Sequence, residues 1–139
     1  MAIAIRTMRI NDYTGALKLW QSLPGIGLSG ADKKEQIQVF LEKNPGNCFV
    51  AVEKNEIIGT ILGGSDGRRG YLYHLAVNQQ QQKQGLGKKL VEECLASLKV
   101  LGIQKCHIFV ISDNLEGMDF WEKVGWVKRD DILIMSKDL

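Results

Sequence analysis

At 139 residues, with 45% hydrophobic and 24% charged residues, the chain has the length and composition of one ordinary globular domain, which we expect to span residues 1–139. Its formal net charge is +2, which gives no strong electrostatic argument for binding nucleic acid or a membrane surface. Three cysteines without a Cys-x-x-Cys pair, two histidines and no visible signal peptide argue against a metal site and favour a cytoplasmic location.

The first third of the chain predicts one strand and two helices. Alternating apolar and polar residues indicate a first strand over 2–8. Asn11 or Asp12 then caps a helix whose apolar side chains share one face. After a stretch rich in glycine, a second amphipathic helix follows over about 32–43, and Asp32 is its expected cap.

The middle of the chain is dominated by strand signals. Two short strands over 48–52 and 57–62 are joined as a hairpin by four polar residues. The glycine-rich segment 63–70 is expected to be a flexible, partly charged loop. It leads into a central strand over 71–77.

The last third continues with the longest helical pattern. Apolar residues at steps of three or four predict a helix over about 85–101. The run 106–111 is apolar nearly throughout, which is typical of a strand buried on both faces. A short helix over 115–124 follows, and strands over 126–129 and 132–137 are expected to form a final hairpin.

The segment between the central strand and the long helix has the pattern of an anion site. A helix start presents free backbone N–H groups and a partial positive charge, which together bind phosphate. Gly85 and Gly87 would let the backbone approach such an anion closely. The spacing is neither a dinucleotide fingerprint nor a P-loop. On this local pattern alone, a pyrophosphate site and a plain turn are equally good interpretations.

Two blocks resemble the GNAT family of N-acetyltransferases. The signature of its acetyl-CoA motif is Arg/Gln-x-x-Gly-x-Gly/Ala, and Gln82, Gly85 and Gly87 occupy the three fixed positions. Residues 114–126 are similar to the family's Asn-x-x-Ala-x-x-hydrophobic-Tyr-Glu-x-x-Gly-Phe segment. The glycine-rich segment 63–70 resembles that of a group of small bacterial acetyltransferases.

The resemblance implies a fold and an activity. The fold is α/β (α+β), with a mixed, mostly antiparallel seven-stranded sheet flanked by four helices in the order β-α-α-β-β-β-α-β-α-β-β. The sheet would be splayed between the fourth and fifth strands. The activity is transfer of an acetyl group from acetyl-CoA, the co-substrate, to a primary amine of a small molecule or protein, by direct attack on the thioester. We expect a monomer or homodimer that uses no metal.

The resemblance also implies how the cofactor is held. Backbone amides of the central strand would hold the pantetheine arm, and amides of the glycine turn would bind the pyrophosphate. The cofactor-binding residues implied in this way are Leu75, Ala76, Val77, Gln82, Lys83, Gln84, Gly85, Leu86, Gly87, Lys88, Asn114 and Trp121.

The expected catalytic residues are Tyr73 and Tyr71, which fall where relatives place Glu or His. A tyrosine, with an ordinary pKa of ~10, is a poor base at neutral pH. It is better suited to order a water or to act as an acid, and the alternative is that both rings are pocket walls or core aromatics. Strand alternation places His74 on the opposite face, which favours a packed or hydrogen-bonded structural role for it.

One departure from the family pattern leaves alternatives open. Trp121 stands where relatives have the tyrosine that serves as general acid, and an indole N–H transfers no useful proton. A non-catalytic acyl-CoA-binding or sensor module is therefore the second interpretation, and a structural protein without a CoA site is the third. In the family, the substrate is set partly by the loop over 21–32, whose only acidic residue here is Asp32.

Overall fold

The computed structural model describes residues 2–139, which form two compact units. The larger unit ends at Phe109 and contains the sheet and three α-helices. The smaller unit, Val110–Leu139, contains α4 (Leu115–Lys123). The expectation of a single domain stays a prediction. No helix within residues 2–139 is long and apolar enough to cross a membrane.

The sheet of the larger unit has five strands in their sequence order. They are β1 (Ala4–Thr7), β2 (Phe49–Glu53), β3 (Glu56–Ser65), β4 (Gly70–Val77) and β5 (Cys106–Ile108). Neighbours are antiparallel from β1 to β4, and β5 lies parallel to β4. A parallel pair needs a crossover connection, which α3 (Leu86–Val100) supplies here.

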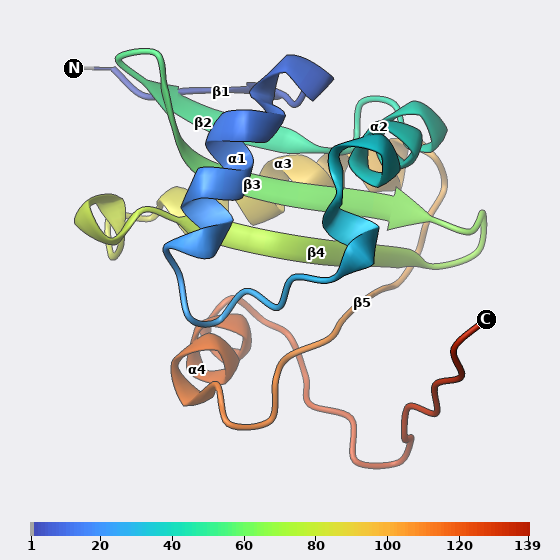
Figure 1. Cartoon of the computed structure of the whole chain (residues 1–139). Helices are drawn as coiled ribbons and strands as arrows, with labels where there is room; N and C mark the ends of the chain where they lie inside the picture. Colours follow the sequence, from blue (N-terminus) through green and yellow to red (C-terminus); the bar gives the residue numbers. More distant parts are fainter. Residues whose placement is uncertain (1) are drawn as a thin grey trace. The chain divides into compact units, whose positions relative to one another are not determined.

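Helices cover both faces of this sheet. Figure 1 shows α1 (Tyr13–Gln21) and α2 (Lys34–Lys43) in front of the strands and α3 behind them. The core on the side of α1 and α2 joins helix and strand side chains in one buried cluster: Met8, Ala16, Leu19, Trp20, Ile37, Cys48, Val50, Leu62 and Ala76. The apolar faces of the two amphipathic helices are buried against the sheet in this way.

The predicted loop over 63–70 is largely strand. The strand β3 includes its first three residues, and β4 begins at its last one. A Cβ on Gly63 would collide with the thiol of Cys94 on α3, and one on Gly64 would lie 2.7 Å from the ring of Phe40 on α2. These glycines therefore permit close packing of two helices on the sheet, and the expectation of a flexible loop is wrong for them.

The predicted seven strands and their order are wrong at the C-terminal end. No strand is formed over 126–129 or 132–137, so the described chain has five strands. The apolar side chains of this segment lie open, with Leu133 93% and Met135 95% exposed. A two-stranded hairpin is only marginally stable by itself, and exposed side chains give it no packing energy.

Strand β5 is also shorter than predicted, ending at Ile108 instead of at residue 111. Its three residues are half-buried, and Phe109 beyond them is 54% exposed. The prediction of burial on both faces is therefore wrong. Among the described strands, β5 lies at the edge of the sheet and pairs only with β4.

Candidate active site

The turn between β4 and α3 presents unpaired backbone donors. Gly85 adopts a left-handed conformation with φ +83° and ends the turn without a side-chain cap on the helix. The first amide bonded into the helix is that of Lys89, which donates to the carbonyl of Gly85 at 3.1 Å. Within the described chain, the amides of Leu86, Gly87 and Lys88 therefore have no acceptor. Together with the helix dipole they form a site suited to an anion.

The glycine turn is tied to the end of β4 by Gln82. Its side-chain amide donates to the carbonyl of Val77 at 2.8 Å. Its own backbone N–H reaches the carbonyl of Gln79 at 3.4 Å. Gln82 thus shapes the turn, while the free donors begin beyond it.

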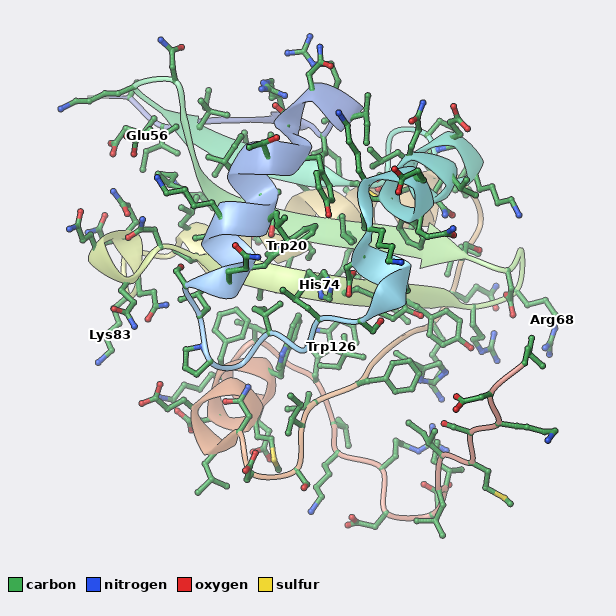
Figure 2. All side chains as sticks on the ribbon, in the orientation of Figure 1. Trp20, Glu56, Arg68, His74, Lys83 and Trp126 are labelled. Carbon is green, nitrogen blue, oxygen red and sulfur yellow. The ribbon has the colours of Figure 1, made fainter. Side chains whose placement is uncertain are left out.

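The basic residues near the motif do not form one group. Lys83 follows the C-terminal end of β4 and Arg68 precedes its start, and Figure 2 shows them at opposite ends of the strand. A strand of 8 residues spans about 26 Å. Arg68 therefore lies far from the glycine turn, whereas Lys83 and Lys88 are exposed beside it.

One edge of β4 is open beside this turn. The strand β5 pairs only with Gly70, Tyr71 and Leu72. Over the described residues, the rest of β4, from Tyr73 to Val77, has β3 as its only strand neighbour. A free strand edge offers backbone N–H and C=O groups to an extended ligand that carries amides.

A β-bulge interrupts β4 at the start of its open edge. The pairing register with β3 shifts between Thr60 and Leu62, and His74 has a left-handed φ of +50°. The Thr60 hydroxyl donates to the carbonyl of His74 at 2.8 Å and accepts from the indole N–H of Trp20 at 2.8 Å. These bonds hold the bulge in place.

The bulge changes which side chains share a face of the sheet. Tyr73 packs against the core cluster that contains Ala76, although simple alternation would separate two residues three positions apart. The ring of His74 contacts that of Trp20 on α1, with centroids 4.8 Å apart. His74 therefore lies on the side of α1 and α2, and its predicted placement opposite Tyr73 is wrong.

Asp32 is the hydrogen-bond partner of His74. The distance between Nε2 of His74 and Oδ1 of Asp32 is 2.7 Å, and the two side chains are only 14% and 12% exposed. The second oxygen of Asp32 accepts from the backbone N–H of Ser29 at 2.9 Å. Because the carboxylate is used in this way, the prediction that it caps α2 is wrong, and Lys33 takes the N-cap position without a side-chain bond.

Sequence reasoning found each member of this pair but not the pair itself. The residues lie 42 positions apart, and Asp32 belongs to η2 (Gly30–Asp32), between α1 and α2. The one available signal was that the loop 21–32 carries a single acidic residue. His74 is packed against Trp20 and hydrogen-bonded to Asp32, whereas the structural role predicted for it stays a prediction.

Aromatic side chains from α2 and from the end of the larger unit contact the two predicted catalytic tyrosines on β4. Tyr73 makes an edge contact with Phe40 at 6.1 Å, and Tyr71 stacks on Phe109 at 6.2 Å. Burial raises the pKa of the Tyr73 phenol, and the nearby Tyr71 raises it further. A phenol is protonated at neutral pH even without this shift, so the Tyr73 hydroxyl suits an acid better than a base.

The smaller unit holds the other two predicted cofactor residues. The side-chain oxygen of Asn114 accepts from the N–H of Gly117 at 3.0 Å and so caps the start of α4. Trp121 makes edge contacts with Phe120 at 5.2 Å and Trp126 at 5.1 Å. Their part in cofactor binding stays a prediction.

No group of three or more His, Cys, Asp or Glu side chains within residues 2–139 is placed to hold a metal ion.

Comparison with known proteins identifies the family. Residues 15–126 match the family model described as "Acetyltransferase (GNAT) family". The chain belongs to the GNAT family. It is thus an enzyme of the N-acetyltransferase class, and the family resemblance of its two motifs is confirmed.

Relatives of this GNAT protein match it over nearly their whole length. An acetyltransferase of Sodalis glossinidius is 28% identical, over 97% of this chain and 94% of its own. An acetyltransferase of Photorhabdus laumondii is 30% identical over the same shares. The PaiA N-acetyltransferase of Thermoplasma acidophilum, solved in complex with coenzyme A, is 20% identical with a TM-score of 0.79, covering 94% of this chain and 92% of its own. At that identity the structural likeness shows the fold.

Proposed function

We propose that this protein transfers the acetyl group of acetyl-CoA to a primary amine of a small molecule or protein by direct attack on the thioester. The observation that carries the proposal is the open edge of β4 leading into a turn with unpaired amides at Leu86, Gly87 and Lys88. An extended ligand that contains both peptide-like amides and a pyrophosphate fits these two features together.

The residues present suit acetyl-CoA, which supplies an activated acetyl group as a thioester when it is bound. Backbone groups of Leu75, Ala76 and Val77 would line the pantetheine arm along the open edge. The turn from Lys83 to Lys88 would hold the pyrophosphate, and Gln82 would act by fixing the shape of that turn. A role of Asn114 and Trp121 in binding acetyl-CoA stays a prediction from the family resemblance.

The two tyrosines have different proposed roles. A phenol of ordinary pKa ~10 is protonated at neutral pH. Burial raises the pKa of Tyr73 further, so we assign to it the donation of a proton to the leaving sulfur. Tyr71 stacks on Phe109 and would form a wall of the acceptor pocket. Tyr73 would thereby supply the acid that Trp121 cannot supply.

Calorimetric titration with acetyl-CoA tests the cofactor site. Wild-type protein is expected to bind with a Kd on the order of micromolar. Gly85→Glu should abolish binding, because it places a negative charge among the donors. Gly102→Glu is the matched control, since Gly102 ends the same helix at its other terminus with φ +86° and equally open space for a side chain. Equal loss of binding in both variants, or no binding by the wild type, would contradict the proposal.

The second candidate function is a non-catalytic acyl-CoA-binding module. The observation that favours it is Trp121, whose ring is engaged with Phe120 and Trp126. Release of free thiol from acetyl-CoA across a panel of primary amines separates the two functions. Acetylated product from the wild type rules out the binding module, and tight binding without product would favour it.

A further inference from the structure

We propose that His74 is the general base that deprotonates the acceptor amine, and that Asp32 is the positioning residue that orients its ring. The inference rests on the proposed function and adds to it the group that accepts the amine proton. The interacting atoms belong to distant parts of the sequence, the bulge of β4 and the end of η2. Figure 2 shows His74 beside Trp20 on the face of the sheet that carries α1.

The pair fixes which nitrogen of His74 carries the proton. A carboxylate only accepts hydrogen bonds, so Nε2 at 2.7 Å from Oδ1 of Asp32 must be the protonated nitrogen. The other nitrogen, Nδ1, then has a free lone pair. In the serine-protease triad an aspartate likewise orients a catalytic histidine, but there it bonds to Nδ1 and leaves Nε2 as the base. Here the two nitrogens have exchanged roles.

The lone pair of Nδ1 is available to a ligand. Nδ1 of His74 makes no hydrogen bond to a described residue. Among the described residues, the one side-chain polar atom that is both buried and without a partner is Oε1 of Gln81, so Nδ1 is not buried. Nδ1 is therefore unpaired and still reachable, although the side chain as a whole is only 14% exposed. An unpaired, reachable acceptor on an otherwise buried ring is the form that a proton acceptor needs.

The backbone of His74 is held in a costly conformation. A φ of +50° is unfavourable for a residue with a Cβ. The carbonyl bond to Thr60 and the ring contact with Trp20 hold it there. A bulge that served only to bend the strand would be better formed by glycine, so the strained histidine points to a role for its side chain.

The position of the ring matches the proposed reaction. His74 directly precedes Leu75, at the point where β4 has lost its pairing with β5. Tyr73, the proposed acid, directly precedes His74 in the sequence and packs on the same face of the sheet as His74. Acid and base are thus adjacent on one strand, beside the edge where the thioester would lie.

The protons balance as follows. Nδ1 of His74 takes one proton from the acceptor ammonium, and the carboxylate of Asp32 stabilises the resulting imidazolium. Attack of the freed lone pair forms the C–N bond as the C–S bond of the thioester breaks. The second amine proton replaces the one that Tyr73 gives to the leaving sulfur, and the imidazolium then releases its proton to solvent.

The ring tautomer can be measured without any cofactor. The protein has two histidines, so His107→Gln leaves the ring of His74 as the only signal. Two-bond nitrogen–proton correlation spectra at about pH 8 are expected to show Nε2–H and a bare Nδ1 for His74. In Asp32→Asn this preference should weaken. An Nδ1–H tautomer in the wild type would overturn the proposal.

The kinetic test uses His74→Gln, because a glutamine Nε2 can still donate to Asp32 while it accepts no amine proton. Its kcat/KM is expected to fall roughly 100-fold or more, with acetyl-CoA affinity retained. The acid limb of the pH profile should disappear, because the variant has no imidazole that could take up a proton. Among the described residues, the titratable side chain bonded to the ring is Asp32 from η2. Tyr13 of α1 bonds to the carbonyl of Asp32, and Tyr73 precedes His74 on β4.

Tyr13→Phe is the matched structural control. The Tyr13 hydroxyl donates to the backbone carbonyl of Asp32 at 2.6 Å, so its loss loosens η2 without removing either member of the pair. Its pH profile should keep the shape of the wild type. A wild-type pH profile and kcat/KM in His74→Gln would overturn the base while leaving the acetyltransferase function standing. Absence of turnover by the wild type would overturn both.

Discussion

The indole N–H of Trp20 donates to the hydroxyl of Thr60 across 2.8 Å, and both side chains are completely buried. The same hydroxyl donates to the carbonyl of His74, also at 2.8 Å. One oxygen atom therefore connects α1, β3 and the bulge of β4. Because none of these groups reaches water, each depends on the others for its hydrogen bond.

Thr60→Val is expected to destabilise the protein by about 2 kcal/mol, since it leaves a buried indole N–H and a bulge carbonyl without their partner. Urea unfolding followed by tryptophan fluorescence measures the loss. Thr60→Ser is the control, because it keeps the hydroxyl and loses only a methyl group. A valine variant as stable as the serine variant would contradict this account.

The pairing of Arg6 with Asp12 predicts how stability falls in acid. Two bonds of 2.8 Å join the guanidinium to both carboxylate oxygens, and the N–H of Arg9 adds a third. The Arg6 side chain, followed by the Arg9 amide, lowers the pKa of Asp12. The unfolded state therefore binds the proton more readily, so this contribution is complete above about pH 4 and is lost as pH falls through the lower folded value.

Asp12→Asn should cost about 1–2 kcal/mol at pH 7, toward the low end for charged bonds because Arg6 is 35% exposed. The measurement is the urea midpoint between pH 7 and pH 2. Wild type and variant should converge in stability as pH falls below about 4. A constant difference over that range would show that the pair has no role in acid sensitivity.

Gly63→Ala tests the close approach of α3 to β3. The added Cβ would collide with the thiol of Cys94 and lie 2.6 Å from the carbonyl oxygen of Asn47. Overpacking of this kind costs about 1–3 kcal/mol. Gly30→Ala is the control, because no heavy atom lies within 4 Å of its new methyl group. Equal thermal midpoints for the two variants would contradict the packing described here.

Thiol labelling tests the burial of the cysteines. Burial raises the pKa of Cys48 to about 11 and also raises that of Cys94 above its ordinary value. Cys106 is less buried, so at pH 8 it should react first with a disulfide reagent in the native protein. The fast phase should vanish in Cys106→Ser and all the thiols should react in denaturant. A fast native phase that survives Cys106→Ser would refute the assignment.

Local patterns were enough for the parts of the fold whose signal lies in neighbouring residues. The long helix, the central strand and the glycine turn were each predicted within a few residues of their observed bounds. The turn needs a residue with a positive φ at position 85, and glycine adopts such a φ without strain. The segment 63–70 was misread, because the packing of Cys94 and Phe40 on its glycines comes from elsewhere in the chain.

By itself, the sequence determined the family, the strand–turn–helix that presents free amides, and the two tyrosines on the central strand. Periodicity, capping and glycine spacing encode these features over a few residues. Only the tertiary structure decided the face on which His74 lies and that Asp32 is its partner. Side chains alternate between the two faces of a strand only while its pairing register is regular. The bulge in β4 shifts that register, and the bond from Thr60 on β3 to the carbonyl of His74 holds the bulge in place. A pair 42 residues apart then forms because the fold brings η2 onto β4.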